Sequence, residues 1–219
     1  MVVLFYSIII CLIIVVSIVL LSGYLEFRRT INIRSIDERI IEVGKRESYV
    51  TIKHISKSLI KAVVSIEDHR FYNHNGIDLI SLCRALIFNI KKKRLAQGGS
   101  TITQQLCKNL LFTNSKTLKR KVSEFFAAVY IERYYSKDKI LEVYLNIIYL
   151  GNGYYGIKEA SYGYYGVSPA SLNLRQSTLI AGIIQAPSIF NLKKCDKKEL
   201  ERQKQVMKAM IKYNNRNKK

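Results

Sequence analysis

The first feature of the chain is an apolar run at its N-terminus. Among the first 21 residues Ser7 and Ser17 are the only polar ones, and none is charged. A helix of this length, at about 1.5 Å per residue, spans roughly 30 Å, the thickness of one hydrocarbon core. A cleaved signal peptide would instead have Lys or Arg before a shorter apolar run. The pattern predicts an uncleaved transmembrane anchor over residues 1–22 and a juxtamembrane connector over residues 23–50.

Beyond the connector, apolar residues recur three or four positions apart, the spacing typical of amphipathic helices. Helices are predicted over residues 56–71, 78–90, 101–111, 117–129, 137–150 and 174–184. The segment 78–90 runs into a basic block, which fits either a helix at a membrane surface or a core helix with a solvated end. The sequence GYYG occurs at 153–156 and again at 163–166, which predicts two similar turns. Because strand signals are few, the predicted fold class is mainly α.

Charge adds a second property, an affinity for an anionic partner. The chain has 36 Lys and Arg against 16 Asp and Glu, a net charge of +20. Nucleic acid, anionic lipid headgroups and phosphate-bearing substrates could each balance it. Residues 193–219 form a basic C-terminal tail, predicted to be a solvated terminal helix. A hydrophobic fraction of 48% excludes intrinsic disorder, and four scattered cysteines exclude a disulfide scaffold.

Two glutamates are the main candidates for chemistry. Glu67 closes an apolar helix just before a turn, where partial burial would raise its pKa toward the range of a general base. Glu124 lies one helical turn from Lys121 and close to other cations, so the two would share a face. The alternatives are a solvated helix end for Glu67 and a surface ion pair for Glu124. Two carboxylates are typical of glycosyl chemistry, and the cations suit a phosphate leaving group.

A glycine turn at residues 97–101 is a further candidate for a binding site. Thr101 and Gln104 fit a capping box, so a helix is expected to begin after this turn. The free N–H groups at its start suit a phosphate or sugar oxygen, although the P-loop pattern is absent. His69 and His74 lack a common metal-ligand spacing and are expected to be structural.

The chain also carries four motifs in order. They are EDHRFYNHNG at 67–76, GGSTITQQ at 98–105, RKVSE at 120–124 and KILEVYLN at 139–146. Together they resemble the motifs of the peptidoglycan glycosyltransferases, glycosyltransferase family 51, in their monofunctional form. The resemblance runs from about residue 59 to residue 191. It weakens at 174–182, where the family usually has an acidic residue and alanines, and at Leu192, where it has proline.

The resemblance implies a lysozyme-like, mainly α catalytic domain over residues 51–192, beside the membrane. It implies polymerisation of lipid II, in which the growing glycan passes from its undecaprenyl-pyrophosphate carrier to the 4-hydroxyl of lipid II. The product would be β-1,4-linked glycan, formed with inversion. No transpeptidase domain is expected, because the chain ends near residue 219. A glycan hydrolase and a catalytically inactive binding module are the alternatives.

The resemblance also assigns roles to residues. Glu67 would be the general base, and Glu124 would be the second catalytic carboxylate. The pyrophosphate would be held by Lys108, Arg120 and Lys121. The other substrate-binding candidates are Ser100, Thr101, Gln105, Arg84, Lys116, Asp68, Phe71 and His74. The segment 78–94 would lie in the membrane near the lipid tail of the substrate.

Cofactors, partners and location follow from the same resemblance. No organic cofactor is expected, and a divalent ion, Mg²⁺ or Mn²⁺, near Glu124 is an open option. The expected partners are lipid II, nascent glycan and lipids of the cytoplasmic membrane, with other cell-wall synthases left open and no nucleic acid. The expected location is the bacterial cytoplasmic membrane, as a single-pass protein with its catalytic domain on the extracytoplasmic side. Arg28, Arg29 and Arg34 would indicate the opposite side by the positive-inside rule.

Overall fold

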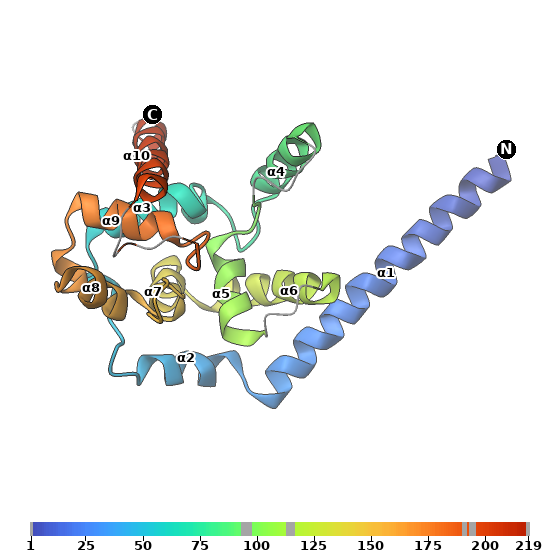
Figure 1. The fold of residues 1–219 in the computed structure, drawn as a ribbon. Helices are drawn as coiled ribbons and strands as arrows, with labels where there is room; N and C mark the ends of the chain where they lie inside the picture. The colour runs from blue at the N-terminus through green and yellow to red at the C-terminus, as the bar shows by residue number, and fades with distance from the viewer. Residues whose placement is uncertain (1, 93–97, 113–116, 190–191, 193–195, 218–219) are drawn as a thin grey trace.

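The computed structural model describes residues 2–92, 98–112, 117–189, 192 and 196–217 (Figure 1). Within these ranges all regular structure is helical, apart from one isolated antiparallel bridge between Tyr149 and Tyr155. The α-helices are α1 Val2–Ile33, α2 Ile36–Gly44, α3 Lys57–Glu67, α4 Leu79–Lys92, α5 Ile102–Leu111, α6 Leu118–Tyr134, α7 Lys137–Ile147, α8 Ile157–Tyr165, α9 Leu174–Ile183 and α10 Lys197–Asn217. Short 3-10 helices are η1 Ile52–His54, η2 Phe71–Asn73 and η3 Pro169–Ser171. The mainly α prediction is confirmed.

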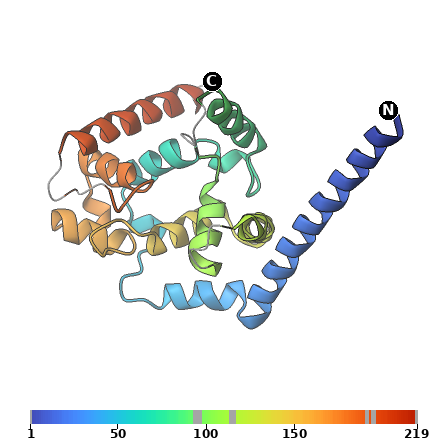
Figure 2. The ribbon, with the colours of Figure 1, turned by 45° about the vertical axis from the view of Figure 1, so that its right-hand side comes forward.

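Helix α1 contains the apolar N-terminal run and continues well past it. Its most apolar stretch has a mean hydropathy of 3.2, and the helix is long and apolar enough to cross a membrane. Its N-terminal part extends away from the other helices (Figure 2). From Gly23 onward it packs on α6, so closely that a Cβ on Gly23 would lie 2.4 Å from Val122 Cγ1. Residues 23–33 of the predicted connector are therefore a helical continuation of the anchor.

Helix α7 forms the centre of the core. Each residue from Ile140 to Ile147 is buried, and α7 contacts α2, α5, α6 and α8. Asn146 Oδ1 accepts a hydrogen bond from the backbone amide of Val50 at 2.7 Å, which holds the segment before α3 against α7. A close-packed central helix of this kind is a rigid support, because its side chains have little room to move. Helix α5, which carries much of the candidate site, is packed directly on it.

The basic tail folds back onto the body. Helix α10 packs across α3 and α9 (Figure 2) and buries Val206 and Met210, which lie one turn apart. Arg202 Nε donates a hydrogen bond to the carbonyl of Gly182 at 3.1 Å. The prediction of a terminal helix is confirmed, but the prediction that it is solvated is wrong. The apolar residues of the tail are sparse, yet their helical spacing gives α10 one face that packs.

The apolar pattern did not predict two short helices, α2 and α8, each of nine residues. Helices of this length contain too few apolar repeats to be distinguished from turns. Helix α8 begins after Gly156, whose φ is 83°, and ends at Gly166 in the left-handed conformation. The GYYG at 153–156 is thus a turn ahead of the helix, whereas that at 163–166 is the end of the helix. The prediction of two similar turns is wrong.

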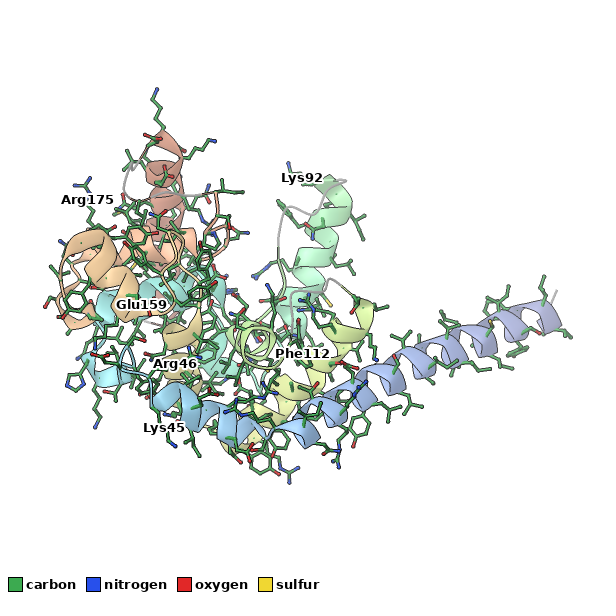
Figure 3. All side chains as sticks on the ribbon, turned by 60° about the horizontal axis from the view of Figure 1, so that its bottom comes forward. Lys45, Arg46, Lys92, Phe112, Glu159 and Arg175 are labelled. Atoms are coloured by element: carbon green, nitrogen blue, oxygen red, sulfur yellow. The ribbon has the colours of Figure 1, made fainter. Side chains whose placement is uncertain are left out.

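Helix α4 stands apart from the body (Figure 1). Ala85 is the one buried residue among its 14. Its exposed apolar residues are Leu79, Ile80, Leu82, Leu86, Ile87, Phe88 and Ile90. Figure 3 shows Lys92 at the tip of α4, far from Lys45 and Arg46 at the end of α2. The exposure excludes a core helix and favours one that meets a membrane surface. The basic residues 93–94 lie outside the described residues.

Candidate active site

Glu67 lines an open cavity of about 530 Å³. It is the last residue of α3, and its carboxylate lies against α5. Gln105 Nε2 donates a hydrogen bond to Glu67 Oε2 at 2.8 Å, and the hydroxyl of Tyr144 donates to Gln105 Oε1 at 2.9 Å. Because Tyr144 is fully buried, it fixes the amide of Gln105 and, through it, the orientation of the carboxylate.

Burial raises the pKa of Glu67 above its ordinary value. The hydrogen bond from Gln105 and the charge of Arg202 lower this pKa, and the charge of Asp68 raises it, but burial has the largest effect. The half-buried side chain excludes the alternative of a solvated helix end. A carboxylate with a raised pKa is a stronger base than an ordinary glutamate, as proton abstraction from a hydroxyl requires.

Asp68, Phe71 and His74 lie in the loop that follows Glu67 and contact one another or the start of α5. Asp68 Oδ2 lies 3.0 Å from His74 Nε2 and accepts the first amide of α5 at 3.0 Å. The side chain of Phe71 is fully buried and packs edge-on against the ring of His74. These contacts join the loop after α3 to the start of α5. The three residues, predicted to shape the site, thereby fix the distance between Glu67 and its partner on α5.

The residues at the start of α5 both stabilise the helix and line the Glu67 cavity. Thr101 is the N-cap, and the predicted capping box with Gln104 is confirmed. Thr101 also lines the Glu67 cavity, but its hydroxyl donates to the carbonyl of Gly76 at 2.6 Å and is therefore used within the turn. Ser100 lines the cavity, and its Oγ accepts a hydrogen bond from Lys121 Nζ at 2.8 Å. Ser100 thus connects the glycine turn to the cations of α6.

Glu124 is a buried carboxylate held between two cations. Its exposed fraction is 1%, which excludes a surface ion pair. Lys121 Nζ donates to Glu124 Oε2 at 2.8 Å, and Arg120 Nε lies 3.2 Å from Glu124 Oε1. Glu124 Oε1 and two nitrogens of Arg120 are buried without a well-aligned hydrogen bond to any described residue. Buried polar atoms are normally hydrogen-bonded, so this cluster has capacity left for a ligand.

The protein donors around Glu124 do not by themselves make a divalent-metal site. In the part of the chain that the structure describes, no three His, Cys, Asp or Glu side chains gather where they could share an ion. Arg120 and Lys121 already bring two positive charges to Glu124, and these oppose a third. The cluster instead fits an anionic group, because guanidinium and ammonium donors bind phosphate oxygens strongly.

The remaining predicted cations lie in three different settings. Lys108, in the last turn of α5, lines the Glu67 cavity together with Gln105. Arg84 lines the same cavity from α4, where it is exposed and donates to Ser81 Oγ at 3.0 Å. Lys116 lies outside the described residues. Helix α5 thus places the partner of Glu67 and a cation one turn apart on one wall.

Two site residues were not predicted. Arg202 of α10 lines the Glu67 cavity and lowers the pKa of that carboxyl. No local sequence pattern could have predicted that a residue of the basic tail lies next to α3. Tyr144 lies within the motif at 139–146 but was assigned no role there. Its signal was available, since a phenol in a buried helical stripe needs a hydrogen-bond partner.

These features define a class, a helical domain with a half-buried base in an open cavity and a buried carboxylate held by two cations, one of which contacts Ser100 of the cavity wall. The model of the Transglycosylase family matches residues 35–211. The chain belongs to this family, and its domain is a peptidoglycan glycosyltransferase domain. The match begins before the predicted boundary at residue 51 and ends within α10, beyond residue 192.

Several relatives are penicillin-binding proteins. Penicillin-binding protein 1A of Aquifex aeolicus (strain VF5) is 42% identical over 167 residues, which cover 76% of this chain and 23% of that protein. Penicillin-binding protein 1A/1B of Bacillus subtilis (strain 168) is 44% identical over 168 residues, 75% of this chain and 18% of that protein. Penicillin-binding protein 1A of Escherichia coli (strain K12) is 41% identical over 155 residues, 70% and 18% respectively. The chain spans about a fifth of the length of these relatives.

Proposed function

We propose that this chain polymerises the glycan strands of peptidoglycan. The growing strand passes from its undecaprenyl-pyrophosphate carrier to the 4-hydroxyl of lipid II, and a β-1,4 linkage forms with inversion. One observation carries the proposal: along a single wall, α5 holds the base Glu67 through Gln105 and presents Lys108 one turn later. Membership of the transglycosylase family supports the same reaction.

In the proposed step, the carboxylate of Glu67 accepts the proton of the 4-hydroxyl. The hydroxyl oxygen forms a bond to the anomeric carbon of the donor sugar. The bond from that carbon to the diphosphate oxygen breaks, and its electron pair leaves with the diphosphate. Attack on the face opposite the leaving group inverts the anomeric centre. Gln105 holds the carboxylate toward the acceptor, since its hydrogen bond to Glu67 leaves the other oxygen, Oε1, for the proton.

Charge develops on the leaving diphosphate, and the cations of α5 and α6 would neutralise it. Lys108, Arg120 and Lys121 are the residues we assign to this role. Glu124 holds Arg120 and Lys121 in place by two ion pairs and is too buried to act as a solvated nucleophile. A glycan hydrolase has no diphosphate to stabilise, so these cations favour transfer over hydrolysis.

The location is also a proposal. Helix α1 and the exposed apolar face of α4 support a single-pass protein of the cytoplasmic membrane. The body would lie on the extracytoplasmic side, where lipid II is presented. A divalent ion would have to bind with oxygens of the substrate diphosphate, because Mg²⁺ commonly uses one or two carboxylates plus phosphates. Mg²⁺ or Mn²⁺ at Glu124 and contacts with other cell-wall synthases stay predictions.

The test is product analysis after incubation of the detergent-solubilised protein with labelled lipid II. The parent and the control Glu201→Gln, an exposed glutamate on α10, should both form long glycan. Glu67→Gln should form none while keeping its fold, measured by circular dichroism. Glycan from Glu67→Gln would remove Glu67 as the base. If the parent makes no glycan, shortening of added preformed glycan would indicate a hydrolase, and no reaction a binding module.

A further inference from the structure

A second groove, of about 420 Å³, lies between the start of α3 and the C-terminal half of α10. We call it the α3–α10 groove. Lys57 and Lys61 line it from α3, and Met207, Met210 and Ile211 line it from α10. None of the described residues in its lining belongs to the Glu67 cavity. The groove is therefore separate from the candidate active site, and the reaction at Glu67 gives it no role.

The α10 wall of the groove is apolar and open to solvent. Met207 and Ile211 lie one helical turn apart, with exposed fractions of 43% and 59%. Leu174, at the start of α9, lines the same groove and is 50% exposed. Met210 is buried and closes the groove from beneath. Apolar side chains that gather on a surface and are rimmed by polar groups mark a site of interaction with a partner or a membrane.

The α3 wall of the groove is basic. Lys57 and Lys61 are four residues apart, so they share one face of α3. Lys57 is exposed and Lys61 is half-buried, and neither makes a hydrogen bond or ion pair with the residues that the structure describes. The described lining contains no acidic residue, and α10 has no Asp or Glu from Arg202 to its end at Asn217. Two ammonium groups without a counter-ion therefore lie beside an apolar surface.

The groove also lies on the membrane side of the body as proposed above. Figures 1 and 2 both show the C-terminal end of α10 on the side toward which α4 and the N-terminal part of α1 extend, with α2 on the opposite side. The groove follows α10 from Met207 to Asn214, within the last three turns before that end. The orientation that brings α4 to a membrane therefore brings this part of α10 toward the same surface.

We propose that the α3–α10 groove binds one anionic phospholipid of the membrane. Lys57 and Lys61 would bind the phosphate of the headgroup, and Met207 and Ile211 would contact the acyl chains. Basic pockets beside apolar surfaces recognise anionic headgroups in this way. A second copy of this chain fits less well, because a symmetric contact would bring the same two lysines of each copy together. The inference rests on the proposed membrane location, and it is independent of the proposed reaction.

The first test is native mass spectrometry of the full chain in a nonionic detergent, titrated with phosphatidylglycerol or with phosphatidylcholine of the same acyl chains. The first phosphatidylglycerol should bind at least about tenfold more tightly than the first phosphatidylcholine, as expected for two lysines near an anionic headgroup. Lys57→Gln with Lys61→Gln should remove this preference. The control, Lys45→Gln with Lys53→Gln, loses the same charge from exposed positions outside the groove and should retain it.

The second test concerns the apolar wall. Ile211→Ser should weaken the binding of both lipids by about tenfold and leave the preference between them unchanged, because it removes apolar contact and no charge. Ile41→Ser is the matched control, since Ile41 on α2 is 56% exposed and Ile211 is 59% exposed. This control should bind both lipids as the parent does.

Equal affinity of the parent for the two lipids, or an equal preference in the lysine variant and its control, would overturn the proposal. A dimer of the parent that Ile211→Ser dissociates, with lipid binding unchanged, would also overturn it, because the groove would then be an interface between copies. Lipid binding is measured without lipid II, so a parent that makes no glycan overturns the polymerase alone. Circular dichroism checks the fold, and Lys57→Gln alone serves if the double variant does not fold.

Discussion

At the scale of single residues, the raised pKa of Glu67 determines how the reaction depends on pH. A base acts only when deprotonated, so activity should be lost as the pH falls through the pKa of Glu67. This loss should occur at a higher pH than for a solvated glutamate, whose pKa is about 4.3. The hydrogen bond from Gln105 lowers the pKa of Glu67. Gln105→Ala should therefore move the acid limb of kcat/KM to higher pH. An acid limb at or below that of the parent would contradict this role for Gln105.

The same residue predicts a gain in stability. Folding raises the pKa of Glu67, so the folded state is penalised as pH rises through the unfolded and then the folded pKa, and above both values the full cost remains. Glu67→Gln removes this cost. Its Tm in scanning calorimetry should exceed that of the parent at about pH 7.5, and the gain should vanish below about pH 4, where both states are protonated. A gain of equal size at both pH values would instead indicate packing.

Lys108 and Arg120 should differ in what their removal does. Either change to Ala should raise KM for the diphosphate substrate by roughly tenfold to a hundredfold, since hydrogen bonds to charged groups contribute about 1.5–3 kcal/mol. Arg120→Ala should also lower Tm, because it removes one partner of the buried Glu124, whereas Lys108→Ala should not. Lys208→Ala, an exposed change on α10, is the control. Kinetics that match this control would remove the pyrophosphate role.

At the scale of elements, the end of α1 belongs to the catalytic body. Ser123 Oγ donates to the carbonyl of Gly23 at 2.8 Å, and Lys119 pairs with Glu26 at 2.8 Å. Because Ser123 precedes Glu124, this contact fixes the turn of α6 that carries the buried carboxylate. Gly23→Leu should separate the helices and lower both kcat and Tm, measured in detergent. Deletion of residues 2–21 should leave both largely intact, and an equal loss would attribute the effect to the anchor instead.

Local signals made several elements predictable. The cap of α5 lies within four residues, Thr101 to Gln104, and the contact between Lys121 and Glu124 spans one turn. Such features depend on nearby residues alone, so the sequence contains them in full. Local signals likewise indicated Glu67, because it stands at the end of an apolar helix and opens the motif at 67–76. These predictions needed no knowledge of how the helices pack.

Features that depend on packing between distant elements were not predictable. The apolar pattern of α6 includes Leu118, Phe125 and Val129, yet all three are exposed. The buried residues of α6 are Ser123, Glu124, Ala127, Ala128 and Ile131. Ser123 can be buried because α1 packs on α6 and provides its hydroxyl with a hydrogen-bond partner. Helix periodicity finds an apolar face but does not say what covers it. The approach of α10 to the Glu67 cavity and the groove between α3 and α10 depend on contacts of the same kind.

At the scale of the whole molecule, two helices with exposed apolar surfaces lie on one side of the body. The N-terminal part of α1 and helix α4 point to the same side of the body in Figure 1, and α2 lies on the other. The net charge of +20 adds a general attraction to anionic lipid. Because salt screens charge but not apolar contact, the two contributions can be separated. Together they would hold the opening beside Glu67 toward the lipid-borne substrate.

A protein lacking residues 2–21 should therefore still sediment with vesicles of anionic phospholipid. Raising the salt concentration should weaken this binding without abolishing it, because α4 remains inserted. Ile87→Ser should weaken binding at every salt concentration by roughly tenfold, as expected for a buried aliphatic side chain worth about 1.5–3 kcal/mol. Ile41→Ser is a matched control, because Ile41 on α2 and Ile87 are 56% and 54% exposed. If Ile41→Ser weakens binding as much, the body does not dock through α4, and the orientation of the cleft toward the membrane fails with it.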